Sequence, residues 1–220
     1  MDTNLNEIEV RVLGCLIEKE LATPEYYPLS LNALGNACNQ KSNREPVMNL
    51  EEADVLRALD SLRFKQLALV SAEGGRVTKY RHALMEKLRL APAELAILGE
   101  LLLRGPQTTG ELRARAERMH SFADATALED SLRELMERTP QLVTLLPRQS
   151  GRKEQRYAHL FAGMPEPASD EQKNSTPETT RLKVTAENER IASLEAEVAF
   201  LRAEVAELRK AVDDFKAQFE

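Results

Sequence analysis

The sequence predicts a mainly α-helical chain with small β-hairpins, an α+β fold in which one module occurs twice. Two internal similarities carry this prediction. The run Glu9–Ile17 (EVRVLGCLI) returns as Glu94–Leu102 (ELAILGELL), and Lys79–Leu84 (KYRHAL) returns as Arg156–Leu160 (RYAHL). The start and the end of one unit therefore recur in order about 80 residues on, whereas the units of solenoid proteins are typically ~20–50 residues long. We expect the repeated unit to be a small domain.

The first helix of the unit is predicted over residues 5–21 and again over residues 92–104. Apolar residues recur there at the spacing of a helix that buries one face. Both copies place a glycine in the middle of this helix, Gly14 and Gly99. Because an interior glycine costs a helix about 1 kcal/mol relative to alanine, its recurrence at the same point indicates close packing against another helix.

Two further helices are predicted in each copy. The second covers residues 29–39 and 108–118. The third is predicted to begin after Asn49, where Glu52 completes a capping box, and to end near Lys65. Its apolar stripe is Val55, Leu59 and Leu62 in the first copy and Leu128, Leu132 and Leu135 in the second.

A β-hairpin is expected after each third helix, because two short apolar strands flank a glycine-containing turn. The strand pairs are Leu67–Val70 with Arg76–His82 and Leu142–Leu145 with Glu154–Leu160. Three helices followed by a hairpin is the order of a winged-helix domain. We therefore expect two tandem winged-helix domains, residues 1–88 and 89–163.

The sequence changes character twice after the repeats. Residues 164–181 contain prolines and no apolar periodicity, which predicts a flexible linker. Residues 182–220 show heptads with β-branched residues at a and leucine at d, which favours a parallel homodimeric coiled coil. The residues expected to pair two copies are Ile191, Leu194, Val198, Leu201, Val205, Leu208, Val212 and Phe215. The alternative is a single amphipathic helix that folds back onto the body of the chain.

Several dense motifs of the first repeat match a known family. The segments Val12–Lys19 (VLGCLIEK), Tyr27–Leu34 (YPLSLNAL), Ala37–Met48 (ACNQKSNREPVM) and Lys79–His82 (KYRH) resemble the bacterial YceH family. The resemblance is specific over the first repeat and looser over the second. It implies a tandem winged-helix protein, in line with the repeats, and it implies no particular activity.

Composition limits the class of protein. The net charge of −6 falls mostly after the repeats, since residues 1–88 carry −2, residues 89–163 carry +1 and residues 164–220 carry −5. No apolar run approaches the ~18 residues that a membrane helix needs, and the first residues are polar and acidic, so we expect a cytoplasmic protein without a membrane span. The two cysteines, Cys15 and Cys38, are expected to be buried reduced thiols.

Catalytic and metal-binding motifs are lacking. The three histidines, His82, His120 and His159, do not combine with Ser, Cys or carboxylate residues at a motif spacing. The sequence has no Cys-x-x-Cys pair and no glycine-rich phosphate loop. We expect a protein that is not an enzyme and uses no cofactor or metal.

Nucleic-acid binding is the common function of winged helices, in which the third helix enters the major groove and the wing contacts the backbone. Both predicted wings are basic, which fits contacts to phosphate. Their cations are Arg76, Lys79, Arg81, Arg148, Arg152, Lys153 and Arg156. The start of the third helix is acidic in both copies, with Glu51, Glu52, Asp54, Asp124, Glu129 and Asp130. Carboxylates at that end favour the helix dipole but oppose DNA, so sequence-specific reading is not expected.

The connection between the second and third helices of the first repeat is long. Residues 39–48 exceed the ~3–4 residues of a helix-turn-helix turn, and the second repeat lacks their composition. Long loops with their own chemistry often bind ligands, so Asn39, Lys41, Asn43 and Arg44 are candidate contacts to phosphate or to a partner's carboxylates. The alternative is a loop whose polar side chains cap helix ends.

Two functions follow from these patterns. The fold favours a DNA-binding, regulator-like protein with weak sequence specificity, doubled by the coiled coil. The local charges favour the alternative, a protein–protein interaction adaptor that uses the winged-helix surfaces.

The heptads lead to a test of the oligomeric state. Removal of residues 182–220 should convert a homodimer into a monomer, because the apolar seam supplies the pairing energy. Light scattering of the full and truncated chains measures the change. A truncated chain that stays dimeric would show that the repeats themselves associate.

Overall fold

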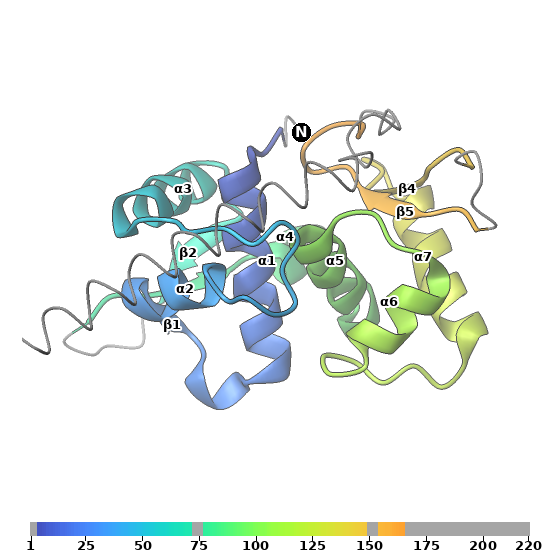
Figure 1. The fold of residues 1–220 in the computed structure, drawn as a ribbon, viewed down its shortest axis with the longest axis horizontal. Coiled ribbons are helices and arrows are strands. Elements are labelled where there is room, and N and C mark those ends of the chain that lie inside the picture. Colours follow the sequence, from blue (N-terminus) through green and yellow to red (C-terminus); the bar gives the residue numbers. More distant parts are fainter. Residues whose placement is uncertain (1–3, 72–76, 149–153, 166–220) are drawn as a thin grey trace, which may run out of the picture. The chain divides into compact units, whose positions relative to one another are not determined.

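Each repeat contains three main helices and a small antiparallel sheet in the computed structural model, which describes residues 4–71, 77–148 and 154–165 (Figure 1). The fold is therefore α+β. Residues 1–167 make up one unit of the chain. The predicted coiled coil with its pairing residues, and the linker apart from Met164 and Pro165, lie outside the described residues.

The first repeat runs from α1 to α4. Its elements are α1 (Glu7–Ala22), the 3-10 turn η1 (Pro24–Tyr26), β1 (Leu29–Ser30), α2 (Leu31–Cys38), α3 (Glu52–Phe64), β2 (Ala68–Val70), β3 (Lys79–His82) and α4 (Leu84–Leu88). The sheet has the order β1-β3-β2, and Tyr80 of β3 pairs with Leu29 on one side and Val70 on the other.

The second repeat keeps the order of the three main helices and the two hairpin strands. These are α5 (Pro92–Arg104), α6 (Thr109–Ala116), α7 (Ala125–Glu137), β4 (Val143–Leu145) and β5 (Tyr157–His159). Gln107 takes the place of β1, because its N–H donates to the Tyr157 carbonyl at 3.0 Å and its carbonyl accepts from the Tyr157 N–H at 2.8 Å. Tyr157 is the repeat equivalent of Tyr80, so both sheets are built on one plan.

Two predicted helix starts are wrong. Residues 29 and 30 form β1 rather than the first turn of a helix, and the Ser30 hydroxyl caps α2 by accepting from the Ala33 N–H at 3.3 Å. Asn49 does not cap the third helix. Instead, α3 begins after Glu51, whose N–H donates to the Asp54 carboxylate at 3.1 Å.

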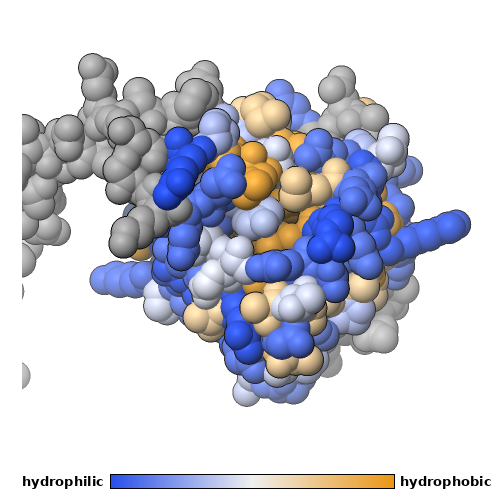
Figure 2. Space-filling model, turned by 90° about the vertical axis from the view of Figure 1, so that its right-hand side faces the viewer, coloured by the Kyte–Doolittle hydropathy of each residue, from blue (hydrophilic) through white to orange (hydrophobic). Residues whose placement is uncertain are grey.

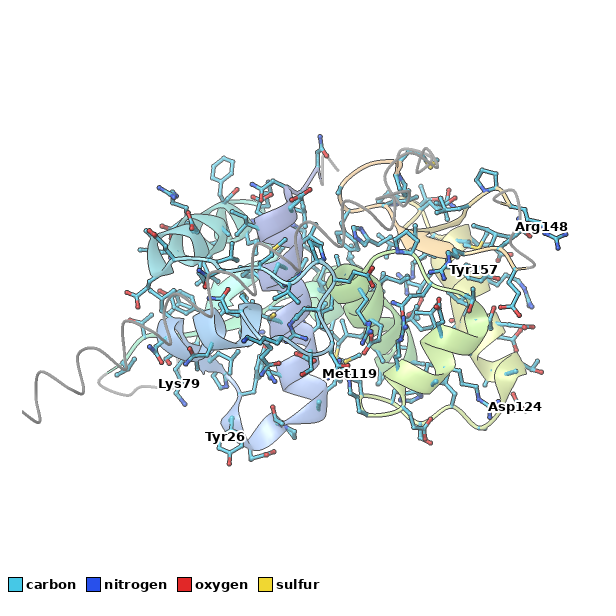
Figure 3. The ribbon with its side chains drawn as sticks, viewed as in Figure 1. Tyr26, Lys79, Met119, Asp124, Arg148 and Tyr157 are labelled. Atoms are coloured by element: carbon cyan, nitrogen blue, oxygen red, sulfur yellow. The ribbon has the colours of Figure 1, made fainter. Side chains whose placement is uncertain are left out.

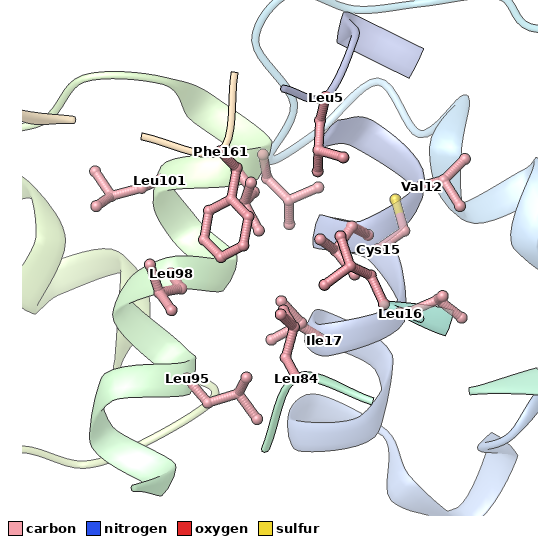
Figure 4. Packing of buried hydrophobic residues seen from close by; sticks show 14 of the residues in the cluster. Leu5, Val12, Cys15, Leu16, Ile17, Leu84, Leu95, Leu98, Leu101 and Phe161 are labelled. Carbon is pink, nitrogen blue, oxygen red and sulfur yellow. The ribbon is translucent and has the colours of Figure 1, made fainter. Parts of the chain in front are cut away.

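One hydrophobic core spans both repeats, and its centre is the contact between α1 and α5 (Figure 4). Ile17 of α1 lies between the two helices beside Gly99, and Leu102 and Leu103 of α5 pack beside Gly14. The N-terminal segment closes one end of the core, because the Leu5 N–H donates to the Phe161 carbonyl at 2.7 Å. The two repeats therefore fold around a shared interior.

The two mid-helix glycines mark the closest approach of α1 and α5. A Cβ on Gly14 would lie 3.0 Å from Leu103 Cδ2, and a Cβ on Gly99 would lie 2.9 Å from Ile17 Cγ2. A Cβ on Gly14 would also lie 3.1 Å from Leu102, the repeat equivalent of Ile17. The glycine of each repeat thus lies against the same position of the other repeat, as in a symmetric contact between two identical subunits. This confirms the close packing predicted from the recurring glycines.

No helix in the described ranges is both long and apolar enough to cross a membrane.

Replacement of glycine by alanine should have opposite effects at Gly35 and Gly99, because only Gly99 lies at the contact between α1 and α5. Gly35 lies inside α2, and a Cβ added there would meet no atom within 4 Å, so Gly35→Ala should stabilise the fold by up to about 1 kcal/mol. Gly99→Ala should lower the free energy of unfolding by about 1 kcal/mol, because the clash with branched Ile17 outweighs the gain in helix propensity. Urea denaturation measures both, and equal effects at the two sites would contradict the close contact.

Candidate binding surfaces

The long loop of the first repeat is closed by its own first residue. The Asn39 side-chain amide donates to the Leu50 carbonyl at 2.9 Å and accepts from the Leu50 N–H at 2.8 Å. This reciprocal pair holds the two ends of the loop together. Asn39 therefore serves the loop itself, and its side chain bonds to Leu50 rather than to a helix end.

Arg44 lies inside the protein, not on its surface. Its side chain has no exposed area, and its Nε donates to the Ala37 carbonyl at 3.0 Å. Its guanidinium binds both carboxylate oxygens of Glu18 on α1, with an Nη1–Oε1 distance of 3.0 Å. Arg44 is thus inaccessible to phosphate or to a partner, and its prediction as a binding contact is wrong.

The loop also contacts the second repeat. The Glu45 N–H donates to the Leu103 carbonyl at 2.9 Å, and the exposed Asn43 accepts from Arg104 of α5 at 2.9 Å. Residues 39–50, which we call the strap, therefore connect α2 to α5 across the two repeats. Lys41 is also exposed on the strap and stays a candidate contact.

A cluster of four charges, three of them buried, lies where the strap meets both repeats. Glu18 of α1 accepts from Arg44 and also from Arg118, which follows α6. Arg118 in turn lies 2.8 Å from the Glu100 carboxylate of α5. The side chains of both glutamates are about 1% exposed. Such carboxylates are tolerated in an interior only when each has a cationic partner.

The cluster alters the acidity of its central carboxylate. Burial by itself raises the pKa of Glu18, but the hydrogen bonds and charges of Arg44 and Arg118 outweigh it, so that the pKa lies below the ordinary value of 4.5. Glu18 is therefore ionised at neutral pH. The cluster joins four segments of the chain through charge rather than through apolar contact.

A second pair of charges recurs in both repeats. Glu9 of α1 lies 2.8 Å from Lys65, and Glu94 of α5 lies 2.9 Å from Arg138. Each glutamate also accepts from the backbone N–H three residues earlier, at 2.8 Å. Each pair thus ties the start of the first helix to the end of the third. The sequence contained this signal, because the four residues occupy equivalent positions of the repeat.

Among the described residues, the predicted wing cations lie at two separate hairpins. Lys79 and Arg148 are exposed and lie at opposite ends of the view in Figure 3. Arg81 pairs with Glu86 at 2.9 Å, and Arg156 contacts Glu111 at 3.1 Å. The remaining three, Arg76, Arg152 and Lys153, lie outside the described residues.

The outer face of α3 carries exposed residues for which the sequence predicted no role. Phe64 is 90% exposed and Leu56 is 38% exposed. The Arg57 side chain is 76% exposed and lies 2.5 Å from Asp54. The signal was present in the helical period, since residues 56, 57 and 64 lie away from the buried stripe of Val55, Leu59 and Leu62.

The matching face of α7 has the opposite chemistry. Counting from the buried stripe, Glu129, Asp130 and Glu137 occupy the positions of Leu56, Arg57 and Phe64, and all three are exposed. Figure 2 shows the side of the molecule that the second repeat forms, where hydrophobic residues appear only in small areas among hydrophilic ones. The repeats therefore share a frame and present unlike third helices.

The histidines at the strand ends have packing roles in this structure. His82 is buried, its Nδ1 accepts from the Leu84 N–H at 3.2 Å, and its Nε2 lies beside the Glu20 carboxylate. Its repeat equivalent is His159, and burial lowers the pKa of that imidazole to about 4. Within the described residues, no group of three His, Cys, Asp or Glu side chains could hold a metal ion.

Comparison with known proteins places the chain in a family. A family model described as "Protein of unknown function, DUF480" matches residues 5–152. The chain belongs to this family. It is 72% identical to a UPF0502 protein of Geotalea uraniireducens, 71% identical to one of Geotalea daltonii and 66% identical to one of Geobacter sulfurreducens, in each case over the full length of both chains.

The charge cluster predicts a large cost for removing one partner in this DUF480 chain. Arg44→Met should lower the free energy of unfolding by about 3–5 kcal/mol, because it leaves the Glu18 carboxylate buried with part of its charge uncompensated. Arg63→Met is the matched control, since Arg63 pairs with Asp60 at the surface and should change stability by less than about 0.5 kcal/mol. Chemical denaturation of both variants measures the difference.

The same cluster predicts a pH dependence. Because the folded pKa of Glu18 lies below its ordinary value of 4.5, its ion pairs stabilise the fold fully above that pH, and the contribution is lost as the pH falls through the folded pKa. Glu18→Gln should remove this part of the acid sensitivity in denaturation measured across a pH series. A variant with the same acid profile as the wild type would show that other carboxylates control it.

Proposed function

We propose that this chain is a non-enzymatic interaction adaptor, built from two winged-helix modules, that docks a protein partner on the exposed face of α3. The single observation that carries the proposal is the group of Phe64, Leu56 and Arg57 on that face. Phe64 is 90% exposed in a helix whose other face is fully packed. Aromatic and arginine side chains are enriched at protein interfaces relative to the rest of the surface.

The winged-helix assignment rests on the order and pairing of the elements. A short strand between the first and second helices joins the hairpin in the first repeat, and Gln107 makes the same backbone pairing in the second. Helix, strand, two helices and a hairpin is the order we expect of a winged helix. It also agrees with the resemblance of residues 1–163 to the YceH family.

Charge supports a protein partner over DNA on the third helices. Glu51 and Glu52 are exposed at the start of α3, and Asp130 and Glu137 are exposed on α7. A third helix that enters the major groove would bring these carboxylates toward phosphates. Apolar Phe64 and Leu56 gain more from burial against an apolar protein surface than from contact with a polar groove.

DNA binding is the second candidate, and exposed cations favour it. Lys79 and Arg148 are exposed at the two wings, and Arg57 projects from α3. We propose that any such binding acts on the backbone with weak sequence preference. A homodimer formed through residues 182–220 would raise the avidity of either activity, because a flexible linker gives a high effective concentration.

Binding to random duplex DNA across a salt series separates the two candidates. The adaptor proposal predicts no measurable binding by fluorescence anisotropy even at low salt. Tight binding that weakens steeply with salt would instead favour phosphate contacts. In that case Lys79→Ala should reduce the dependence of the DNA affinity on salt concentration. An unchanged dependence would exclude the first wing as a site of phosphate contact.

Two single substitutions test the α3 face. Phe64→Ala and Leu56→Ala should each abolish the capture of a protein partner by the full chain from a lysate of the native host. Quantitative mass spectrometry of the captured proteins measures the loss. Tyr26→Ala is the matched control, because Tyr26 is 71% exposed but lies on η1. A partner lost equally with all three variants, or with none, would contradict the α3 docking face.

A further inference from the structure

The outward face of α3 carries four exposed residues along one line of the helix, which we call the seam. They follow one another at intervals of four, three and four residues and are Ala53, Arg57, Asp60 and Phe64. This is the spacing of the a and d positions that face a partner helix in a coiled coil. The seam lies opposite the buried stripe of α3, which packs on α1 and α2. Its geometry therefore suits contact with another helix.

The seam is complementary to itself when two copies of α3 run antiparallel. The register that aligns all four positions places Arg57 of one copy opposite Asp60 of the other. The same register places Ala53 opposite Phe64, and the two-fold symmetry of the pair repeats each contact. The two central layers thus join opposite charges, and the two outer layers set a large aromatic ring against a small side chain.

Other pairings of the third helices bring like charges together. Parallel α3 helices would place Arg57 against Arg57 and Asp60 against Asp60. In α7 the matching positions are occupied by Asp130 and Arg133. An antiparallel pair of α3 with α7 would therefore place Arg57 against Arg133 and Asp60 against Asp130. Because like charges in direct opposition suppress association, the charges favour α3 of a second copy over α7.

The seam charges are accessible in the single chain. Arg57 lies 2.5 Å from Asp54, and its side chain is 76% exposed. Asp60 lies 3.0 Å from Arg63, and its side chain is 59% exposed. A guanidinium has five N–H donors and a carboxylate accepts several hydrogen bonds. Arg57 and Asp60 can therefore bind each other across two copies while each keeps its neighbour on the same helix.

We propose that the protein partner of the α3 face is a second copy of this chain, bound through an antiparallel pair of α3 helices. This pairing rests on the proposed function, which makes the face a protein-docking surface. Phe64, which is 90% exposed in the single chain, supplies apolar surface for burial, and the opposed charges fix the register. The contact is the same on both sides, so it closes after two copies.

The contact is small. A helix of 13 residues is about 20 Å long, so one pair of such helices forms a contact smaller than the ~1,600 Å² of a standard protein interface. It is therefore weak by itself. Residues 182–220 are predicted to pair two copies, which would hold two α3 helices at a high effective concentration. The α3 contact would then be a second and weaker interface of the same homodimer.

Ala53→Cys and Phe64→Cys in one full-length chain test the register. Positions 53 and 64 are ~16 Å apart within a helix, too far for a disulfide, whereas the proposed pair sets position 53 of one copy beside position 64 of the other. Mild oxidation should give a covalent dimer linked between positions 53 and 64, as mapped by mass spectrometry. The native thiols of Cys15 and Cys38 are buried and do not interfere. No covalent dimer, or equal amounts of all possible links, would overturn the proposal.

Charge reversal tests the central layers with the same readout. Added to the cysteine variant, Asp60→Arg should slow formation of the link by about tenfold or more, because it opposes Arg57 of the second copy. Arg57→Asp together with Asp60→Arg should restore the rate, because the two charges are exchanged. A double reversal that stays as slow as the single one would overturn the register.

The matching positions of α7 provide a control. Thr126→Cys and Glu137→Cys have the same spacing on an exposed face that lacks the apolar pair, and they should form no link between copies. A link as fast as that of the α3 variant would mean random collision of surface thiols and would overturn the proposal.

The link also separates this proposal from the docking role of α3. Capture of a different protein from the lysate that Phe64→Ala abolishes, without any link between positions 53 and 64, would overturn the second copy as partner and leave the docking role standing. Absence of both the link and the capture would overturn both.

Discussion

The structure depends on the close approach of α1 and α5. At Gly14 and Gly99 the absence of a Cβ lets Leu102, Leu103 and Ile17 pack directly on the opposite backbone. This contact forms the centre of a core that neither repeat could complete alone, because buried residues of both repeats belong to one cluster. A small domain buries a modest share of its surface, so the pairing of two such modules supplies the interior that each lacks.

The strap and the charge cluster restrict the orientation of the two repeats, which this apolar contact alone does not fix. Hydrophobic packing alone tolerates small rotations of one helix against another, whereas a buried carboxylate must keep its hydrogen-bonded cations. Glu18 holds Arg44 from the strap and Arg118 from the second repeat, and Glu100 holds the other side of Arg118. The cost of separating these charges fixes the relative orientation of the two repeats.

Duplication has produced one frame with two unlike surfaces. The internal supports recur, as in the pairs Glu9–Lys65 and Glu94–Arg138. The outer faces do not, since Phe64 and Glu137 occupy the same position of the third helix. A molecule whose frame is symmetric and whose faces differ is suited to binding through one face while the other serves solubility or a different contact, and this asymmetry underlies the adaptor proposal.

The sequence by itself determined the repeat, the order of the main helices and hairpin strands, and the close packing at the two glycines, because helical period and internal similarity can be read from the sequence alone. It did not reveal that Arg44 is buried, since its partner Glu18 lies 26 residues away and Arg118 lies 100 residues from Glu18. In the sequence, Asn39, Asn43 and Arg44 resemble a polar binding loop. Only the tertiary structure showed that α5 lies against that loop and uses its polar groups. A charge is solvated or buried according to which distant segments surround it, and that is a property of the packed chain rather than of its local pattern.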